Sequence, residues 1–209
     1  MTCHSGTMCH SPTLCEHLFG NQDMTSPILL LPGIGNSGSG HWQTLWTQTD
    51  ASMTLISGQD WDHPVCEEWV ENLETAVRKT GPDVILVAHS LGCLQVANWA
   101  QYSRTVVRGA LLVAVPDPTR DVFPEEAKGF SVPRSEKRFA FPSMMIASSN
   151  DPYADIHYSQ RCADAWGSSL VNIGERGHIN AASGLGDWPQ GRAWLKELIA
   201  MSMSASGNK

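Results

Sequence analysis

The fold of this chain is decided by the stretch Val84-Ile85-Leu86-Val87-Ala88-His89-Ser90-Leu91-Gly92. Four β-forming residues lead into a turn of the pattern small-x-Ser-x-Gly, and residues 91–102 have the composition of a helix. A strand, a sharp turn with a central serine and a helix form the arrangement called a nucleophile elbow. The turn requires small residues two positions before and after the serine. Ala88 and Gly92 meet that requirement, although glycine is more familiar at the first position.

Length and composition indicate one domain with a sizeable core. The chain has 209 residues, of which 42% are hydrophobic, enough for a continuous core. Its formal net charge is −7, whereas nucleic-acid and anionic-membrane surfaces require basic clusters. No apolar run approaches the roughly 20 residues of a membrane span, and the N-terminus lacks the basic and apolar regions of a secretory signal. We therefore predict a cytoplasmic protein without a nucleic-acid or membrane partner.

Cysteine usage fits a reducing compartment rather than a disulfide framework. Three of the six cysteines crowd the N-terminus, and three lie in helix-like patterns, where a free thiol packs as a small apolar group. The first group is Cys3, Cys9 and Cys15, and the second is Cys66, Cys93 and Cys162. We predict that all six are free thiols and that the second group packs within helices.

Residues 1–26 stand apart because they carry a loose six-residue repeat of cysteine, histidine and serine. One interpretation is a metal-binding tract, since both cysteine and histidine bind soft metals. The other is a disordered extension, with Met24 as an alternative start. Metal sites usually separate their cysteines by about two to four residues, a spacing absent here, so we predict disorder and no metal site. The folded domain is expected over residues 27–201, followed by a flexible tail over 202–209.

Strand-like and helix-like segments alternate along the rest of the chain. Uniformly apolar strands separated by helices predict an α/β fold: about six mostly parallel strands with helices on both faces. The expected strands are 28–31, 53–57, 84–87, 109–115, 143–148 and 169–173, and the expected helices are 41–47, 65–79, 91–102, 156–166 and 189–201.

Three residues that suit nucleophilic catalysis each follow a predicted strand. Ser90, Asp151 and His178 occur in this order, and the carboxyl ends of parallel strands meet at one edge of the sheet. A serine hydroxyl needs a base to take its proton, and the base needs a carboxylate to orient it. Each residue alone also has an ordinary interpretation, such as a helix cap at Ser90. The competing acids are Asp155 and Asp117. Asp155 falls too far into the following helical region, whereas Asp117 follows an earlier strand and is the alternative acid.

Attack by a serine creates an oxyanion that requires preorganised backbone N–H donors. We expect one donor at Leu91, at the start of the helix. The second is expected in the glycine-rich loop after the first strand, at Ile34 or next at Gly35. This loop lacks the Gly-Lys-Ser/Thr ending of a phosphate-binding loop and the third glycine of a dinucleotide site. We therefore predict no cofactor. His89, on the opposite side of the turn from Ser90, is expected to be structural.

Several short motifs carry a resemblance to a known family. Over about residues 27–198 the chain is similar to the small α/β-hydrolase-fold serine hydrolases typified by retinoblastoma-binding protein nine, most of all to their bacterial branch. The motifs are Leu-Pro-Gly-Ile-Gly (31–35), His41-Trp42, Gln59-Asp60-Trp61-Asp62, Ala88-His89-Ser90-Leu91-Gly92, Asn150-Asp151-Pro152-Tyr153, Gly177-His178-Ile179-Asn180 and Ser183-Gly184-Leu185-Gly186-Asp187-Trp188-Pro189. The resemblance implies a minimal α/β-hydrolase fold with Ser90 as nucleophile, Asp151 as orienting acid and His178 as base.

The resemblance also suggests a compact enzyme without a lid domain. Residues 118–141, where a lid usually enters, are too few for one and are expected to form a surface loop. An open site suits small acyl esters better than long-chain lipids. Trp61, Asp62 and Tyr153 follow strand ends and are expected to line the acyl pocket.

The resemblance does not extend to a pocket-protein partner. The link of the namesake to the retinoblastoma protein involves a Leu-x-Cys-x-Glu motif. The nearest segments here, residues 64–68 and 91–95, each lack one element of it. We therefore infer no such partner.

The sequence favours hydrolysis of small carboxylic esters through an acyl-serine intermediate. A second hypothesis is a protein that keeps the fold and acts through a protein partner. A third is a thioesterase, amidase or acyltransferase that uses the same three residues, because fold alone does not set the reaction.

Overall fold

The computed structural model describes residues 26–131 and 138–206, which form a six-stranded parallel sheet with helices on both faces. The strands are β1 (Ile28–Leu31), β2 (Met53–Leu55), β3 (Ile85–His89), β4 (Gly109–Val113), β5 (Ser143–Ala147) and β6 (Ser169–Asn172). The helices are α1 (Trp42–Thr49), α2 (Cys66–Thr80), α3 (Leu91–Tyr102), α4 (Ile156–Trp166) and α5 (Pro189–Ser206), with a short 3-10 turn η1 at Ala181–Ser183. The predicted α/β class is confirmed.

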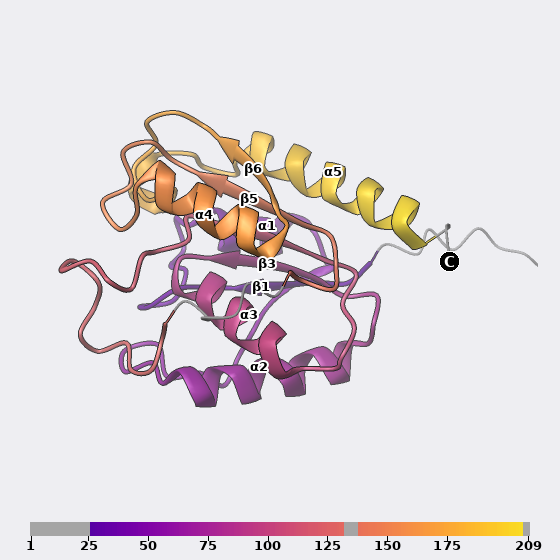
Figure 1. Ribbon diagram of the computed structural model, residues 1–209. Coiled ribbons are helices and arrows are strands. Elements are labelled where there is room, and N and C mark those ends of the chain that lie inside the picture. The colour runs from indigo at the N-terminus through magenta and orange to yellow at the C-terminus, as the bar shows by residue number, and fades with distance from the viewer. Residues whose placement is uncertain (1–25, 132–137, 207–209) are drawn as a thin grey trace, which may run out of the picture.

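The core has two layers because neighbouring strand residues point to opposite faces of the sheet. Leu29 and Leu31 pack in the layer covered by α2, α3 and α4. Ile28 and Leu30 pack in the layer covered by α1 and α5. Figure 1 shows α2 and α3 on one side of the sheet and α5 on the other. Coverage of both faces explains why the strand sequences are apolar throughout rather than alternating.

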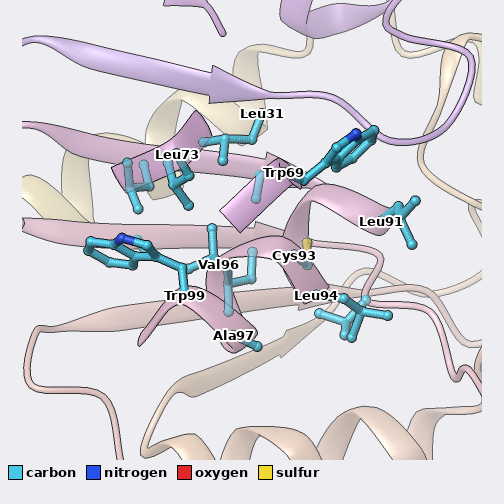
Figure 2. Close-up of a cluster of buried hydrophobic side chains, with 14 of the residues drawn as sticks. Leu31, Trp69, Leu73, Leu91, Cys93, Leu94, Val96, Ala97 and Trp99 are labelled. Atoms are coloured by element: carbon cyan, nitrogen blue, oxygen red, sulfur yellow. The ribbon is translucent and has the colours of Figure 1, made fainter. Parts of the chain in front are cut away.

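The layer around α3 anchors the segment that carries the serine turn. Figure 2 shows Trp69 and Leu73 of α2 in the same cluster as Leu94 and Trp99 of α3. All four side chains are almost completely buried. Burial of four large apolar side chains holds α3, and therefore the start of that helix, in a fixed position on the sheet.

The strand order β2-β1-β3-β4-β5-β6 places a topological switch point between β1 and β3. After β1 the chain forms β2 along one edge of β1, and it then crosses to form β3 along the opposite edge. All adjacent strand pairs are parallel. Ligand sites in open α/β sheets form outside the carboxyl ends of the strands at such a point. The serine turn follows β3 and the glycine-rich loop follows β1, so both lie at this point.

The C-terminal helix is longer than the sequence predicts. Helix α5 continues through Ser206 instead of ending at Met201, and Ser202 is only 3% exposed. The prediction of a flexible tail is therefore wrong for residues 202–206. The Cys/His tract falls within residues 1–25, which lie outside the described residues. In the described part of the chain, no helix has both the length and the apolar character needed to cross a membrane.

The serine turn is strained and tightly packed. Ser90 has φ 53° and ψ −123°, a conformation that a non-glycine residue adopts only when its surroundings enforce it. A Cβ on Gly92 would lie 2.4 Å from the carbonyl oxygen of Leu31 and 2.8 Å from that of Pro32. The predicted need for a small residue at position 92 thus comes from the backbone that leaves β1.

Replacement of Gly92 by alanine is expected to lower the free energy of unfolding by about 3 kcal/mol or more, because the added methyl group meets backbone atoms that cannot rotate away. Urea denaturation of the purified variant measures this change. Gly40→Ala is the matched control, since a Cβ there meets nothing within 4 Å. Equal stabilities of the two variants would contradict the packing argument.

Candidate active site

The Ser90 side chain faces a histidine from a distant part of the chain. Its Oγ lies 2.7 Å from Nε2 of His178, which belongs to the loop after β6. Although Ser90 precedes α3, its hydroxyl makes no capping hydrogen bond to that helix. The backbone N–H of Ser90 donates to the carbonyl of Val113 at the end of β4. The serine is therefore held by its backbone, and its hydroxyl is left for His178.

The other nitrogen of the same imidazole contacts Asp151. His178 Nδ1 lies 3.0 Å from Oδ1 and 2.9 Å from Oδ2 of Asp151, and the two side chains are 9% and 3% exposed. A carboxylate can only accept, so Nδ1 carries the proton and Nε2 presents its lone pair to the Ser90 hydroxyl. The backbone N–H of Tyr153 also donates to Asp151 Oδ1. The structure thus brings the three predicted side chains into one hydrogen-bonded chain.

The alternative acids are engaged elsewhere. The Asp117 carboxylate accepts hydrogen bonds from the backbone N–H and the hydroxyl of Thr119. Asp155 caps α4 by accepting from the N–H of Tyr158 at 2.7 Å. Neither contacts His178 in the described structure, whereas Asp151 does.

Two aromatic side chains hold the backbone of the histidine loop. His89 Nε2 donates to the carbonyl of His178 at 2.9 Å, and Trp42 Nε1 donates to the carbonyl of Ile179 at 2.9 Å. Ile179 has φ 50°, which is rare for a β-branched residue. These two donors fix the loop in its strained path. His89 is therefore a buried residue that supports the histidine loop beside the serine, which is the structural role expected from its position on the turn.

Of the three backbone N–H groups predicted to hold the oxyanion, two have no hydrogen-bond acceptor among the described residues and one is already hydrogen-bonded. A Cβ on Gly33 would lie 3.3 Å from the nitrogen of Leu91, so the loop after β1 runs directly against the serine turn. The N–H groups of Leu91 and Ile34 have no hydrogen-bond acceptor within the described residues. The N–H of Gly35 instead donates to the carbonyl of Trp61 at 2.8 Å. The prediction of Gly35 as a donor is therefore wrong.

A cavity of about 170 Å³ opens at the serine. It is lined by side chains and backbone from five separate segments, namely Gly33, Ile34, Asn36, His41, His89, Ser90, Leu91, Pro116, Phe123, Pro124, Tyr153, His178 and Asn180. Tyr153 was predicted to line it and does so, with its ring centroid 4.5 Å from that of His178.

Trp61 and Asp62 were expected in this pocket and lie outside it. The Trp61 ring packs edge-on against Trp69 of α2 at 5.3 Å. Asp62 is exposed, and its N–H donates to Asp60. The apolar face of a tryptophan is better covered by another core ring than by an open cavity. These two predictions are wrong.

Residues that line the cavity without having been predicted come mainly from the loop after β1 and from the segment between β4 and β5. Phe123 and Pro124 form part of its wall, and Ala127 and Phe130 nearby are buried. This segment was expected to be a surface loop, and its described residues contain no helix. The only local signal was the pair Phe123-Pro124 within a charged stretch.

Burial keeps two histidines beside the cavity neutral. It lowers the pKa of His41 from 6.5 to about 4, with a smaller contribution from His178. Burial also holds the pKa of His89 well below its usual range, with contributions from His178 and His41.

These shifts predict that the folded state loses stability in mild acid. An unfolded chain protonates His41 near pH 6.5, whereas the folded chain resists protonation until about pH 4, so stability is fully present above the unfolded pKa and is lost as the pH falls. From about pH 7 to pH 4.5, His41 should contribute a loss of about 2.5 kcal/mol. Urea denaturation at both pH values measures it. His41→Asn should show a correspondingly smaller loss, and an equal loss would contradict the assignment.

Comparisons with known proteins show the family and the fold of this chain. The sequence profile described as serine hydrolase matches residues 28–197. A protein designated a YdeN-like hydrolase from Pectobacterium atrosepticum is 31% identical, with a TM-score of 0.73 over 84% of this chain and 91% of the other. No match was found among curated protein sequences.

More distant structures share the fold. The ydeN gene product of Bacillus subtilis is 20% identical, with a TM-score of 0.67 over 84% of this chain and 100% of the other. Est1E from Butyrivibrio proteoclasticus, solved with ferulic acid bound, is 13% identical, with a TM-score of 0.61 over 88% and 91%. The profile match covers most of the sheet and helices described above, and the chain therefore belongs to the serine hydrolase family, with the fold of a small α/β-hydrolase.

Proposed function

We propose that the protein hydrolyses small carboxylic esters through an acyl-Ser90 intermediate. In the first half-reaction, Ser90 Oγ attacks the ester carbonyl carbon while His178 Nε2 takes the hydroxyl proton. The oxyanion is held by the N–H groups of Leu91 and Ile34. Collapse breaks the bond to the alcohol oxygen, which leaves with the proton from His178. Water then attacks the acyl-serine, with the same base, and releases the acid.

The observation that carries this proposal is the 2.7 Å contact between Ser90 Oγ and His178 Nε2. Nucleophile and base already lie at hydrogen-bonding distance, which is the geometry that general-base activation requires. The orienting carboxylate of Asp151 keeps the proton on Nδ1 and stabilises the imidazolium that forms. Strain at Ser90, with φ 53°, is also typical of a side chain held for chemistry.

The size and lining of the cavity favour small substrates. Its volume of about 170 Å³ is close to the roughly 150 Å³ that holds a benzene molecule in a protein interior. Ile34, Pro116, Phe123 and Pro124 supply apolar surface for an acyl or alcohol group. A long acyl chain would extend beyond this space. We propose the cytoplasm as its location, which the buried free thiols of Cys66, Cys93 and Cys162 support.

A fluorophosphonate probe tests the proposal directly. Such probes react with a serine that a neighbouring base has activated. We expect labelling of the folded protein, mapped by peptide mass spectrometry to Ser90 alone, and none after heat denaturation. A protein that uses this fold only to bind a partner has no need of an activated serine. Folded wild-type protein that stays unlabelled at Ser90 would overturn the enzymatic proposal.

Matched substrates separate ester hydrolysis from related reactions. Acetyl and butyryl groups can be offered as 4-nitrophenyl esters, 4-nitrophenyl thioesters and 4-nitroanilides, whose chromophoric leaving groups differ only in the atom bonded to the acyl group. We expect the highest kcat/KM for the oxygen esters. A higher value for the thioesters or the amides would replace the esterase assignment by that activity, while the roles of Ser90, Asp151 and His178 would stand.

A further inference from the structure

His41 is a buried histidine at the cavity whose two nitrogens differ in their surroundings. It stands at the N-cap of α1, where Nδ1 accepts a hydrogen bond from the N–H of Gln43 at 3.2 Å. An acceptor nitrogen carries no proton, and burial keeps the pKa of the ring at about 4. In the neutral ring the proton therefore sits on Nε2. The cap thus fixes both the orientation of the ring and its tautomer.

The Nε2–H group has no partner. His41 is 5% exposed, and its Nε2 is buried without a hydrogen-bond acceptor in the described structure. The nearest ring, His89, meets it edge-on at 4.7 Å, and an aromatic face is a much weaker acceptor than oxygen. Buried donors are almost always paired, so an unpaired donor at a functional site calls for an explanation. His41 also lines the cavity at Ser90.

Other polar groups of the cavity are donors as well. The Asn36 side chain accepts from the N–H of Ser37 through Oδ1, and that of Asn180 accepts from the N–H of Ala182 in the same way. Both amides therefore offer their Nδ2–H groups. No aspartate, glutamate, lysine or arginine is among the described residues that line the cavity. This lining favours a neutral hydrogen-bond acceptor over a charged group.

We propose that His41 Nε2–H binds a neutral oxygen of the substrate outside the ester group that is cleaved. The enzyme would then select esters that carry an ether, hydroxyl or ketone oxygen over hydrocarbon esters of the same shape. This inference rests on the proposed esterase function and names its substrate class. His41 acts here in specificity, because a site with a buried donor discriminates against a substrate that leaves the donor unpaired.

Two isosteric pairs of esters test the proposal. The first compares p-nitrophenyl methoxyacetate with p-nitrophenyl butyrate, which places the oxygen in the acyl half. The second compares 2-methoxyethyl acetate with n-butyl acetate, which places it in the alcohol half. Each kcat/KM is divided by the rate constant of hydroxide-catalysed hydrolysis, to remove intrinsic reactivity. We expect the wild type to prefer the oxygenated ester about tenfold in one pair, and that pair locates the bound oxygen.

Variants at His41 separate recognition from helix capping. Asparagine is a preferred N-cap residue, so His41→Asn keeps the cap and removes the Nε2–H donor. It should lower the corrected preference to about one. His41→Gln places an amide N–H near the position of Nε2 and should restore part of the preference. His63→Asn, the same change at an exposed histidine, should leave the preference at its wild-type value.

The outcomes distinguish this inference from the proposed function. Equal corrected rates for both members of both pairs in the wild type would overturn the role of His41, while turnover itself would still support the esterase. A His41→Asn variant that loses activity equally on both members, with its preference unchanged, would show a structural role only and would also overturn the inference. Absence of all turnover and of Ser90 labelling would overturn both.

Discussion

Replacement of Ser90 by alanine is expected to lower kcat toward p-nitrophenyl acetate by about 10⁶-fold, the scale found when a serine nucleophile is removed from a serine hydrolase. The Ser90 Oγ is the atom that would form the acyl bond. In the described structure its hydroxyl contacts His178 and makes no capping hydrogen bond to α3. Alanine fits the same space, so the fold should persist. Spectrophotometric turnover, with circular dichroism as a check of folding, measures the effect.

Ser149→Ala is the matched control for that loss. Ser149 is an exposed serine two positions before Asp151, and its removal should change kcat less than about twofold. A Ser90→Ala protein that retained more than about one per cent of wild-type turnover would contradict a covalent mechanism at this residue.

Replacement of Asp151 by asparagine is expected to lower kcat by about 10⁴-fold. An amide in this position can donate to Nδ1 of His178 and so favour the proton on Nε2. The nitrogen that faces Ser90 would then be unable to accept its proton. The side chains are nearly isosteric, so the loss should appear in kcat rather than in stability. Steady-state kinetics together with urea denaturation separate the two.

Asp117→Asn tests the competing acid. Its carboxylate is already bound by Thr119, so the variant should keep kcat within about threefold of the wild type. If Asp117→Asn lost the activity and Asp151→Asn kept it, the orienting acid would have to be reassigned to Asp117.

The sequence predicts the sheet and the three interacting side chains because both depend on local patterns. Apolar runs mark buried strands, and the carboxyl ends of parallel strands necessarily share an edge. Ser90, Asp151 and His178 each follow such a run, so their meeting follows from topology. The requirement for glycine at position 92 is also local in the sequence, although the atoms that impose it belong to Leu31 and Pro32.

The pocket depends on long-range packing that no local pattern reveals. Trp61 follows a strand end, yet its ring packs on Trp69 and its carbonyl accepts the Gly35 N–H. Phe123 reaches the cavity from an irregular segment. His41 shows its unpaired nitrogen only once the surrounding side chains are placed. The position of each of these side chains depends on contacts with residues far away in the sequence, and those contacts are known only from the three-dimensional structure.

The extension of α5 was missed for a simpler reason. Residues 202–206 are rich in serine, a residue with modest helix propensity that often marks helix ends. Tertiary packing overrides this preference, since Ser202 is buried. Within the helix, its hydroxyl donates to the carbonyl of Ile199.

The contact of Gly92 with the carbonyls of Leu31 and Pro32 has a consequence for how this enzyme can diversify. It packs the serine turn tightly against the loop after β1, so a larger residue at position 92 would displace that loop. Phe123 and Pro124 line the same cavity from a segment that belongs to no strand or helix. Changes there can reshape the substrate wall while the reacting atoms keep their positions. A library for new ester preferences should therefore vary residues 123 and 124 and leave 31–33 and 88–92 intact.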